Sequence, residues 1–199
     1  MSGSKPIVES GRFRYRRRRA WRLTGLAVTF QDVSPDEDRL VAPFYLDMMG
    51  TNAIEYADAD LLRSVAAVGR DASVVDVVWL LRGAWRPRVM GAWFSLLHAS
   101  EAMTRAVLQS LETSSGSLTA PPLAVAAVLL AGHEAQSALG DYVTQDLSHQ
   151  WGAAAFVGAA IEHLGSRAPT ELSEQHRSSF AQMLAIGKTV RDHQGQPSA

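Results

Sequence analysis

Apolar residues recur at helical spacing along most of the chain from residue 38 onward, which predicts a mostly α-helical protein. The first clear buried face is predicted by four aliphatic residues at i, i+3, i+4 and i+7: Val74, Val77, Val78 and Leu81. Ser73 precedes this run and Asp76 follows it by three positions, which is the pattern of a capping box. We therefore expect a helix that begins after Ser73 and ends at Gly83.

The same spacing continues toward the C-terminus. Further helices are predicted from about Pro87 through Leu97, Met103 to Leu111, Ala120 to Ala131, about Glu134 to Leu147, Trp151 to Leu164, and from a cap at Thr170. The stretch Ala120–Ala131, with Thr119 as its expected cap, is apolar on every side. A helix of this kind is covered by neighbours all round, so we place it in the middle of the fold.

Three of these segments align with one another. Met90-Gly91-Ala92 matches Leu123-Ala124-Val125 and then Ala155-Phe156-Val157, in steps of 33 and 32 residues. Such steps are typical of proteins built from repeated helix pairs. We therefore expect an all-α fold, a short HEAT-like stack of antiparallel helix pairs (an α-solenoid), with an irregular helical bundle as the alternative.

Length and composition divide the chain into three parts. The 199 residues, 47% hydrophobic and 20% charged, suit one globular domain. We assign residues 1–37 to an Arg-rich flexible arm with a possible short extended segment, 38–192 to the helical domain and 193–199 to a frayed C-terminus. No apolar run reaches the roughly 18 residues of a membrane span, so we expect a soluble protein.

The chain contains no cysteine. This excludes disulfide frameworks, thiolate nucleophiles, Fe–S clusters and the zinc sites that need cysteine, and it favours a reducing cytoplasm. Phosphate-binding glycine loops and paired-histidine metal motifs are missing as well. The candidate metal ligands are three pairs, which we interpret as helix caps and solvated surface histidines: His133 with Glu134, Asp146 with His149, and Glu162 with His163. We expect no metal and no cofactor.

Charge is unevenly distributed. Residues 1–22 hold eight basic side chains and one acidic, a net charge of +7, so residues 23–199 carry −8. The arginines of the arm, interleaved with aromatic residues, are Arg12, Arg14, Arg16, Arg17, Arg18, Arg19 and Arg22. Such a run binds phosphate backbones while its aromatic residues stack on bases. The arm is expected either to bind nucleic acid in this way, to fold back on the acidic remainder, or to be a solvated extension.

A short segment between two predicted helices concentrates aromatic and basic residues. Trp85, Arg86 and Arg88 lie close together at the helix–helix turn. We expect the two arginines either to pair with acids of the preceding helix, such as Asp76, or to present a cationic rim to a ligand, with Trp85 as a wedge between helices. These four residues are the candidate binding residues.

The same segment carries a family resemblance. Trp85-Arg86-Pro87-Arg88, the Gly-Ala-Trp of residues 91–93 and the upstream Pro43-Phe44-Tyr45-Leu46 resemble an uncharacterised family of bacterial proteins, a domain of unknown function with serial number six thousand. The resemblance covers roughly residues 38–165. It implies a small helical, HEAT-like protein, and it implies no activity or catalytic residues.

These observations lead to three hypotheses of function. The first is a non-catalytic protein-binding module, regulatory or of the toxin-immunity type, whose acidic body steers a basic partner such as a nuclease toxin. The second is a nucleic-acid-associated protein that uses the arm of residues 12–22. The third, an enzyme acting through Asp76, Arg86, Arg88 or the Asp146 and His149 pair, has the least support, so we expect no catalysis.

Overall fold

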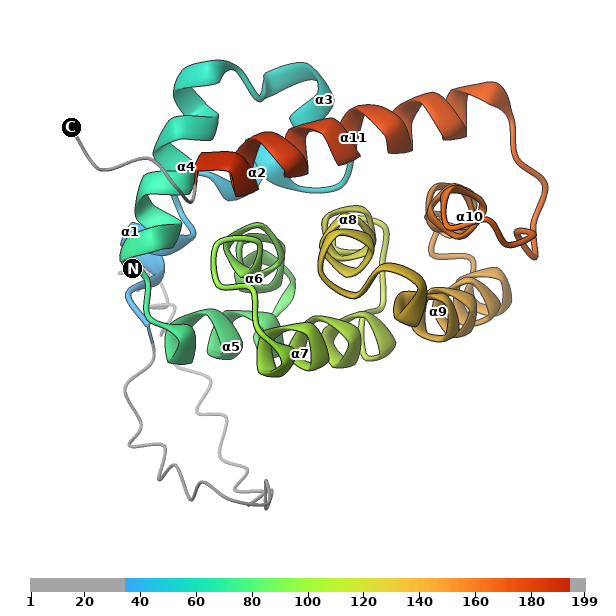
Figure 1. Cartoon of the computed structure of the whole chain (residues 1–199), viewed down its shortest axis with the longest axis horizontal. Helices are drawn as coiled ribbons and strands as arrows, with labels where there is room; N and C mark the ends of the chain where they lie inside the picture. Colours follow the sequence, from blue (N-terminus) through green and yellow to red (C-terminus); the bar gives the residue numbers. More distant parts are fainter. Residues whose placement is uncertain (1–34, 194–199) are drawn as a thin grey trace, which may run out of the picture. The chain divides into compact units, whose positions relative to one another are not determined.

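The computed structural model describes residues 35–193, which belong to one compact unit, Ser34–Ala199 (Figure 1). Every regular element in that range is a helix, and none of these residues forms a strand. The predicted all-α class is therefore confirmed. The arginine arm of residues 12–22 lies outside the described residues, as do residues 194–199.

Four helices form the first part of the described chain. They are α1 (Glu37–Leu40), α2 (Tyr45–Met48), α3 (Ala53–Tyr56) and α4 (Ala59–Asp71). The longest of these is α4, and Asp58 is its N-cap. The Asp58 carboxylate accepts hydrogen bonds from the backbone N–H groups of Asp60 and Leu61. This is the standard N-cap arrangement, and it satisfies donors that the helix itself leaves free.

Six helices follow as three consecutive pairs. They are α5 (Val74–Arg82) with α6 (Trp85–Ser95), α7 (Glu101–Glu112) with α8 (Ala120–Ala131), and α9 (Gln136–His149) with α10 (Ala154–His163), with a 3₁₀ turn, η1 (Gly132–Ala135), between α8 and α9. In each pair the two helices pack against each other. Helices α6, α8 and α10 lie side by side in one row, seen end-on in Figure 1, and α5, α7 and α9 form a second row. The three segments that align in the sequence fall in α6, α8 and α10.

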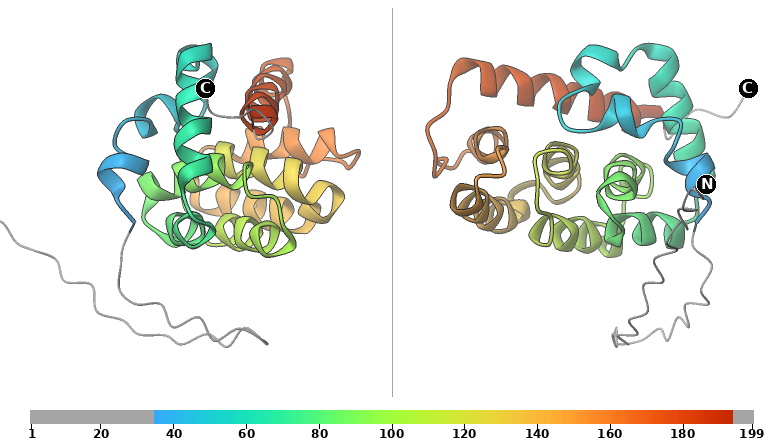
Figure 2. Two further views of the ribbon diagram at one scale, coloured as in Figure 1. Left: turned by 60° about the vertical axis from the view of Figure 1, so that its left-hand side comes forward. Right: turned by 180° about the vertical axis from the view of Figure 1, so that it is seen from behind.

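The last helix, α11 (Glu174–Asp192), runs across the row of α8 and α10 and reaches α3 and α4 (Figures 1 and 2). It approaches α8 closely at Gly187, where a Cβ atom would stand 2.6 Å from Val125 Cγ1 and 2.8 Å from Leu129 Cδ1. Helix α11 therefore connects the first part of the described chain to the last pair of helices.

Helix α8 is the centre of the core. It contacts α6, α7, α10 and α11, and its residues from Ala120 to Val128 are buried. This explains why the helix is apolar on every side, as predicted. It ends at Gly132, which has a φ of 54°. By length and composition the helical stretch Ala120–His149 could cross a membrane, a test that the core helix of a soluble protein also passes; half of its most apolar window is buried inside the fold.

The predicted face of α5 is partly wrong. Val77 and Leu81 are buried as expected, but Val74 is 47% exposed and Val78 is only half-buried. Leu80 completes the buried face instead. The reason is that α6 and α7 pack on the side of α5 where Val77, Leu80 and Leu81 lie.

Two of the predicted caps are also corrected. The hydroxyl of Thr119 makes no cap bond to α8 and pairs with the Ser114 hydroxyl instead. The last helix starts after Ser173 rather than after Thr170, because Ser173 and His176 form a capping box. By contrast, the predicted capping box at the start of α5 is confirmed.

The start of α10 differs from the prediction too. The helix was expected to begin at Trp151, but it begins at Ala154. Before it the backbone turns through two residues with positive φ, Gln150 at 57° and Gly152 at 95°. Trp151 lies within this turn, where its backbone cannot continue a helix.

Candidate functional site

Three of the described side chains form an aromatic and cationic cluster where α6 begins, in which Trp85 and Arg86 are exposed and Tyr45 is half-buried. The rings of Tyr45 and Trp85 meet edge to face, with their centroids 5.6 Å apart. The guanidinium carbon of Arg86 lies 4.9 Å from the Trp85 ring centroid and 5.3 Å from that of Tyr45. Trp85 is 38% exposed, and Leu46, next to Tyr45, is 54% exposed. We refer to Tyr45, Leu46, Trp85 and Arg86 as the α2–α6 surface.

The fold holds this surface in place from two sides. Helix α2 packs on α6, and the buried Trp93 donates its Nε1–H to the backbone carbonyl of Met48 over 2.9 Å. At the other side, α5 turns tightly into α6 at Gly83, where a Cβ would stand 3.0 Å from Pro87 Cβ. The turn places Trp85 and Arg86 in the first turn of α6, beside α2. The surface is thus preorganised by buried contacts beneath it.

Cationic residues are concentrated in the chain segment that supplies Trp85 and Arg86. Between residues 77 and 100 the chain has Arg82, Arg86 and Arg88 and no Asp or Glu. The first turn of α6 contains no acidic residue, and no side chain caps it. Helix starts usually carry acids, because the helix dipole is positive there. Among the described residues, neither Arg82 nor Arg86 takes part in an ion pair.

Arg88, a predicted binding residue, has a different role. Its Nη1 donates a hydrogen bond to the backbone carbonyl of Thr113, 3.0 Å away, at the end of α7. Its Nε atom is buried and has no hydrogen-bond partner in the part of the chain that the structure describes. Burial lowers the pKa of the Arg88 guanidinium from its ordinary value. Arg88 therefore links α6 to the end of α7 and is largely withdrawn from the surface.

Asp76 is not part of this cluster, and the predicted pairing with Arg86 or Arg88 is wrong. Its Oδ2 accepts hydrogen bonds from the N–H of Ser73 over 3.1 Å and from the Ser73 hydroxyl over 2.7 Å. These bonds hold Asp76 in the first turn of α5, whereas the α2–α6 surface adjoins the opposite end of that helix. Its role is to cap the helix.

Tyr45 and Leu46 were not among the predicted binding residues. They lie in α2, a helix of four residues, which is too short for a hydrophobic period to show. The only signal in the sequence was the segment Pro43-Phe44-Tyr45-Leu46, in which an aromatic and an aliphatic residue stand next to each other. Only the packing of α2 on α6 brings Tyr45 to Trp85 and Arg86.

The Asp146 region proves to be structural. Asp146 is 2% exposed, and its carboxylate accepts hydrogen bonds from the N–H groups of Gly152 at 3.0 Å and Ala153 at 2.8 Å, just before α10. His149 instead stacks on the ring of Trp151, with centroids 5.0 Å apart. The described residues contain no cluster of three or more side chains suited to hold a metal ion.

Tyr142 completes this buried arrangement. Its hydroxyl donates a hydrogen bond to the carbonyl of Gly116 over 3.2 Å. Burial, together with the negative charge of Asp146 and a hydrogen bond to it, raises the pKa of Tyr142 well above its ordinary value. The tyrosine is therefore neutral at physiological pH and joins α9 to the loop before α8.

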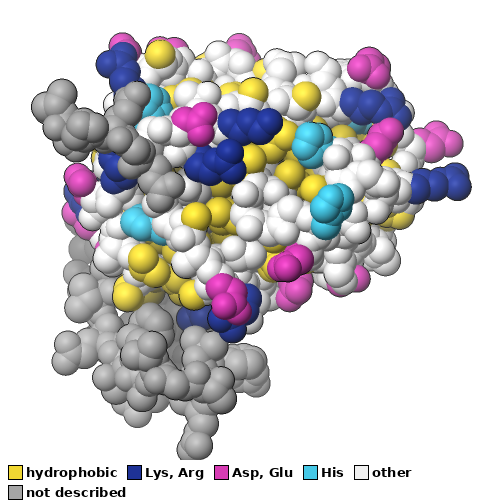
Figure 3. Space-filling model, in the orientation of Figure 1, with side chains coloured by type: hydrophobic (Ala, Val, Ile, Leu, Met, Phe, Trp, Pro, Cys, Tyr) yellow, Lys and Arg dark blue, Asp and Glu magenta, His cyan; other side chains and the backbone are white. Residues whose placement is uncertain are grey.

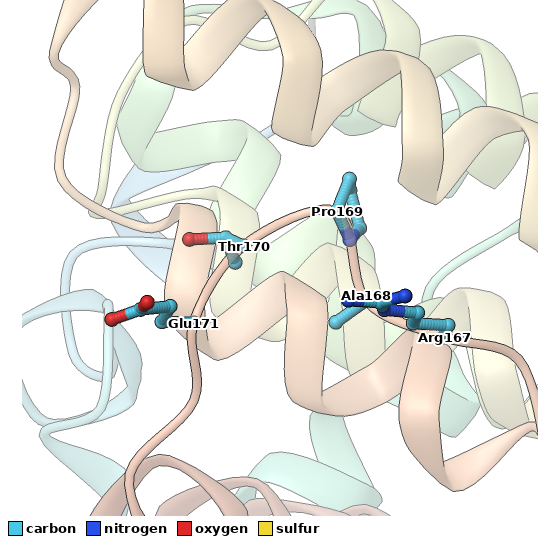
Figure 4. A pocket seen from close by; sticks show the side chains of 5 residues that line it. All are labelled: Arg167, Ala168, Pro169, Thr170 and Glu171. Atoms are coloured by element: carbon cyan, nitrogen blue, oxygen red, sulfur yellow. The ribbon is translucent and has the colours of Figure 1, made fainter.

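The loop between α10 and α11 and the mixed-charge face of the molecule lack the features of a binding site. The loop between α10 and α11 has a shallow hollow whose lining side chains point in different directions (Figure 4): Arg167, Ala168, Pro169, Thr170 and Glu171. Thr170 also packs on α10, since its Cγ2 would stand 2.9 Å from a Cβ at Gly158. On the face shown in Figure 3, acidic and basic side chains are interspersed. Neither region gathers side chains for one ligand.

Comparison with known proteins finds no family model, no curated protein and no solved structure that matches the chain. The resemblance to the uncharacterised bacterial family therefore stays a hypothesis. The function has to be argued from the α2–α6 surface itself.

Proposed function

We propose that the protein is a non-catalytic protein-binding module, a short HEAT-like stack of helix pairs, and that the α2–α6 surface is its contact site. The observation that carries the proposal is the cluster of half-buried Tyr45 with exposed Trp85 and Arg86, together with exposed Leu46, the next residue after Tyr45. Trp, Tyr and Arg are the residues that most often dominate the binding energy of protein interfaces.

The contacts within the surface support this function. Trp85 and Tyr45 pack edge to face, and the Arg86 guanidinium lies over both rings. A partner that binds here has few side-chain rotamers left to immobilise, so less conformational entropy opposes association. Stacked helix pairs commonly act by presenting such a preformed surface to another macromolecule.

Nucleic-acid binding through the arginine arm is the second candidate. It is favoured by the +7 charge of residues 1–22 and by the aromatic residues Phe13, Tyr15 and Trp21 between the arginines. This candidate does not involve the α2–α6 surface, so one experiment separates the two.

The test is affinity purification of the tagged full-length chain from its source cells, with and without nuclease, followed by mass spectrometry. Leu46→Ala and Trp85→Ala are compared with Leu147→Ala. Leu147 is a matched control for Leu46, because it is 50% exposed and lies in α9, whereas Leu46 is 54% exposed. Circular dichroism verifies that each variant is folded.

We expect one stoichiometric protein partner that survives nuclease, is lost with Leu46→Ala and Trp85→Ala, and is kept with Leu147→Ala. Equal recovery by all the variants would show that the α2–α6 surface is not the contact site. Recovery of nuclease-sensitive and salt-sensitive material alone would transfer the function to the arm.

A further inference from the structure

We infer that the α2–α6 surface recognises an acidic segment of its protein partner, with a carboxylate on Arg86 and a neighbouring apolar side chain on Leu46 and Trp85. The inference rests on the proposed function and adds the chemistry of the partner to it. It follows from three properties: a cation with no counter-ion among residues 35–193, an excess of positive charge in the chain segment around it, and exposed apolar area on the same surface.

The cation is Arg86. Its guanidinium is positioned by the rings of Trp85 and Tyr45, at 4.9 and 5.3 Å, and it has no carboxylate partner among the described residues. Contact with an aromatic face occupies no N–H donor, so the edge of the guanidinium stays available for hydrogen bonds. A carboxylate is the ligand that matches this planar edge best, because its two oxygens can accept two parallel hydrogen bonds.

The local charge is opposite to that of the whole body. Residues 23–199 carry −8, yet the segment from 77 to 100 holds Arg82, Arg86 and Arg88 without any acid. Asp47 in α2 is the acid adjacent in sequence to Leu46, and Arg82 and Arg86 outnumber it even when Arg88, which bonds to the end of α7, is left out. Net charge governs long-range steering and favours a basic partner, whereas contact pairs depend on charges within a few ångströms. The segment that touches this surface is therefore acidic even on a basic partner.

The apolar part of the surface distinguishes a protein segment from a nucleic acid. Leu46 and Trp85 are 54% and 38% exposed, so both offer apolar area that aliphatic side chains of a partner would bury. Stacking of a nucleic-acid base needs an open aromatic face. Here the edge-to-face packing of Tyr45 and the guanidinium of Arg86 already occupy the Trp85 ring. A partner segment with a carboxylate next to a Leu or Phe side chain can pair with Arg86 and also cover the apolar part of the surface.

The experiment is a selection from a phage-displayed library of random 12-residue peptides, with the full chain, Arg86→Gln and Arg105→Gln as baits. Arg105 is an exposed arginine on α7 and serves as the matched control. Acidic peptides also bind the arginine run of residues 12–22, and those bind all three baits equally. Only peptides that Arg86→Gln fails to enrich are therefore informative.

We expect these peptides to share an Asp or Glu next to a Leu, Ile or Phe. The best of them is then measured by fluorescence anisotropy. Replacing its acid by the corresponding amide, or Arg86 by Gln, should each weaken binding about tenfold, and the two changes together should weaken it no further than one of them alone.

Enriched peptides without acids, or enrichment that does not depend on Arg86, would overturn the inference. So would Arg86-dependent binding of an oligothymidine probe in place of peptides. The purification with Leu46→Ala tests the proposed function separately. A partner lost with that variant, together with a failed selection for acids, would leave the contact site in place and refute only its chemistry.

Discussion

Trp93 shows how one residue supports both the core and the candidate site. Its side chain is fully buried, and its Nε1–H is donated to the Met48 carbonyl. Trp93→Ala removes the packing and leaves that carbonyl without its donor. We expect a loss of about 3–5 kcal/mol in the free energy of unfolding, measured by urea denaturation followed by circular dichroism.

Two further variants separate the contributions at this position. Trp93→Phe keeps most of the packing and removes the donor, so its cost should be smaller, about 1–3 kcal/mol. Trp85→Ala, on the exposed α2–α6 surface, should change the free energy of unfolding less than either. A cost for Trp93→Ala no larger than for Trp85→Ala would contradict the core role assigned to Trp93.

Tyr142 predicts an alkaline pH dependence. Its pKa is raised in the folded chain, so above the ordinary tyrosine pKa of about 10 the unfolded chain loses this proton while the folded chain keeps it. The stability that Tyr142 provides is therefore complete below pH 10 and falls as the pH rises further. Urea denaturation between pH 8 and 11.5 should show a steeper decline for the wild type than for Tyr142→Phe; equal slopes would refute the prediction.

At the scale of single residues, the sequence identified only part of the site. Trp85 and Arg86 were predicted because aromatic and basic residues next to each other at a helix start are unusual. Asp76 was wrongly grouped with Arg86 and Arg88. It lies in the first turn of α5, and the length of that helix separates it from the start of α6. Tyr45 and Leu46 were missed, because only tertiary packing brings a four-residue helix to the start of α6.

At the scale of elements, glycine sets how closely α5 and α6 approach each other. A Cβ atom at Gly91 would stand 2.8 Å from the backbone nitrogen of Leu81, and a backbone atom cannot move aside as a side chain does. Gly91→Ala should therefore force the two helices apart and cost about 1–3 kcal/mol of unfolding free energy. The measurement is thermal or urea unfolding.

Gly140 is the matched control for Gly91. It lies within α9, and no heavy atom is within 4 Å of the position of its Cβ. Gly140→Ala should stabilise the protein by about 0.5–1 kcal/mol, because alanine loses less backbone entropy in a helix. If both substitutions changed stability in the same direction, the close approach of α5 and α6 would be contradicted.

Helices with a strong local signal were the ones predicted well. Helix α7, and η1 with α9, lie where the sequence predicts helices, and α8 is surrounded by neighbours as its apolar sequence indicates. Helix boundaries were predicted less accurately, because a sequence can contain two residues that are able to cap the same helix. Ser173 rather than Thr170 caps α11, because His176 stands three positions after Ser173 and completes a capping box with it. The three shortest helices gave no periodic signal of their own.

At the scale of the whole described unit, α11 changes how the three helix pairs are coupled. In a plain stack each pair touches only its neighbours, so damage at one end spreads weakly to the other. Here α11 contacts α10 at one end and α4 at the other. Phe180 of α11 is buried and packs edge to face on Phe156 of α10, with centroids 5.6 Å apart. A substitution that removes the Phe180 side chain should therefore lower the local stability of α4 as well.

The last prediction tests this coupling by amide hydrogen exchange under native conditions. Phe180→Ala, with an expected cost of about 3–5 kcal/mol, should lower the protection of α4 amides along with those of α10. Leu139→Ala is the comparison. Leu139 is also buried, but it belongs to α9, in the row formed by α5, α7 and α9. At a similar overall destabilisation, it should reduce the protection of α4 less. Equal losses in α4 for the two variants would mean that coupling spreads through the rows themselves and that α11 has no special part in it.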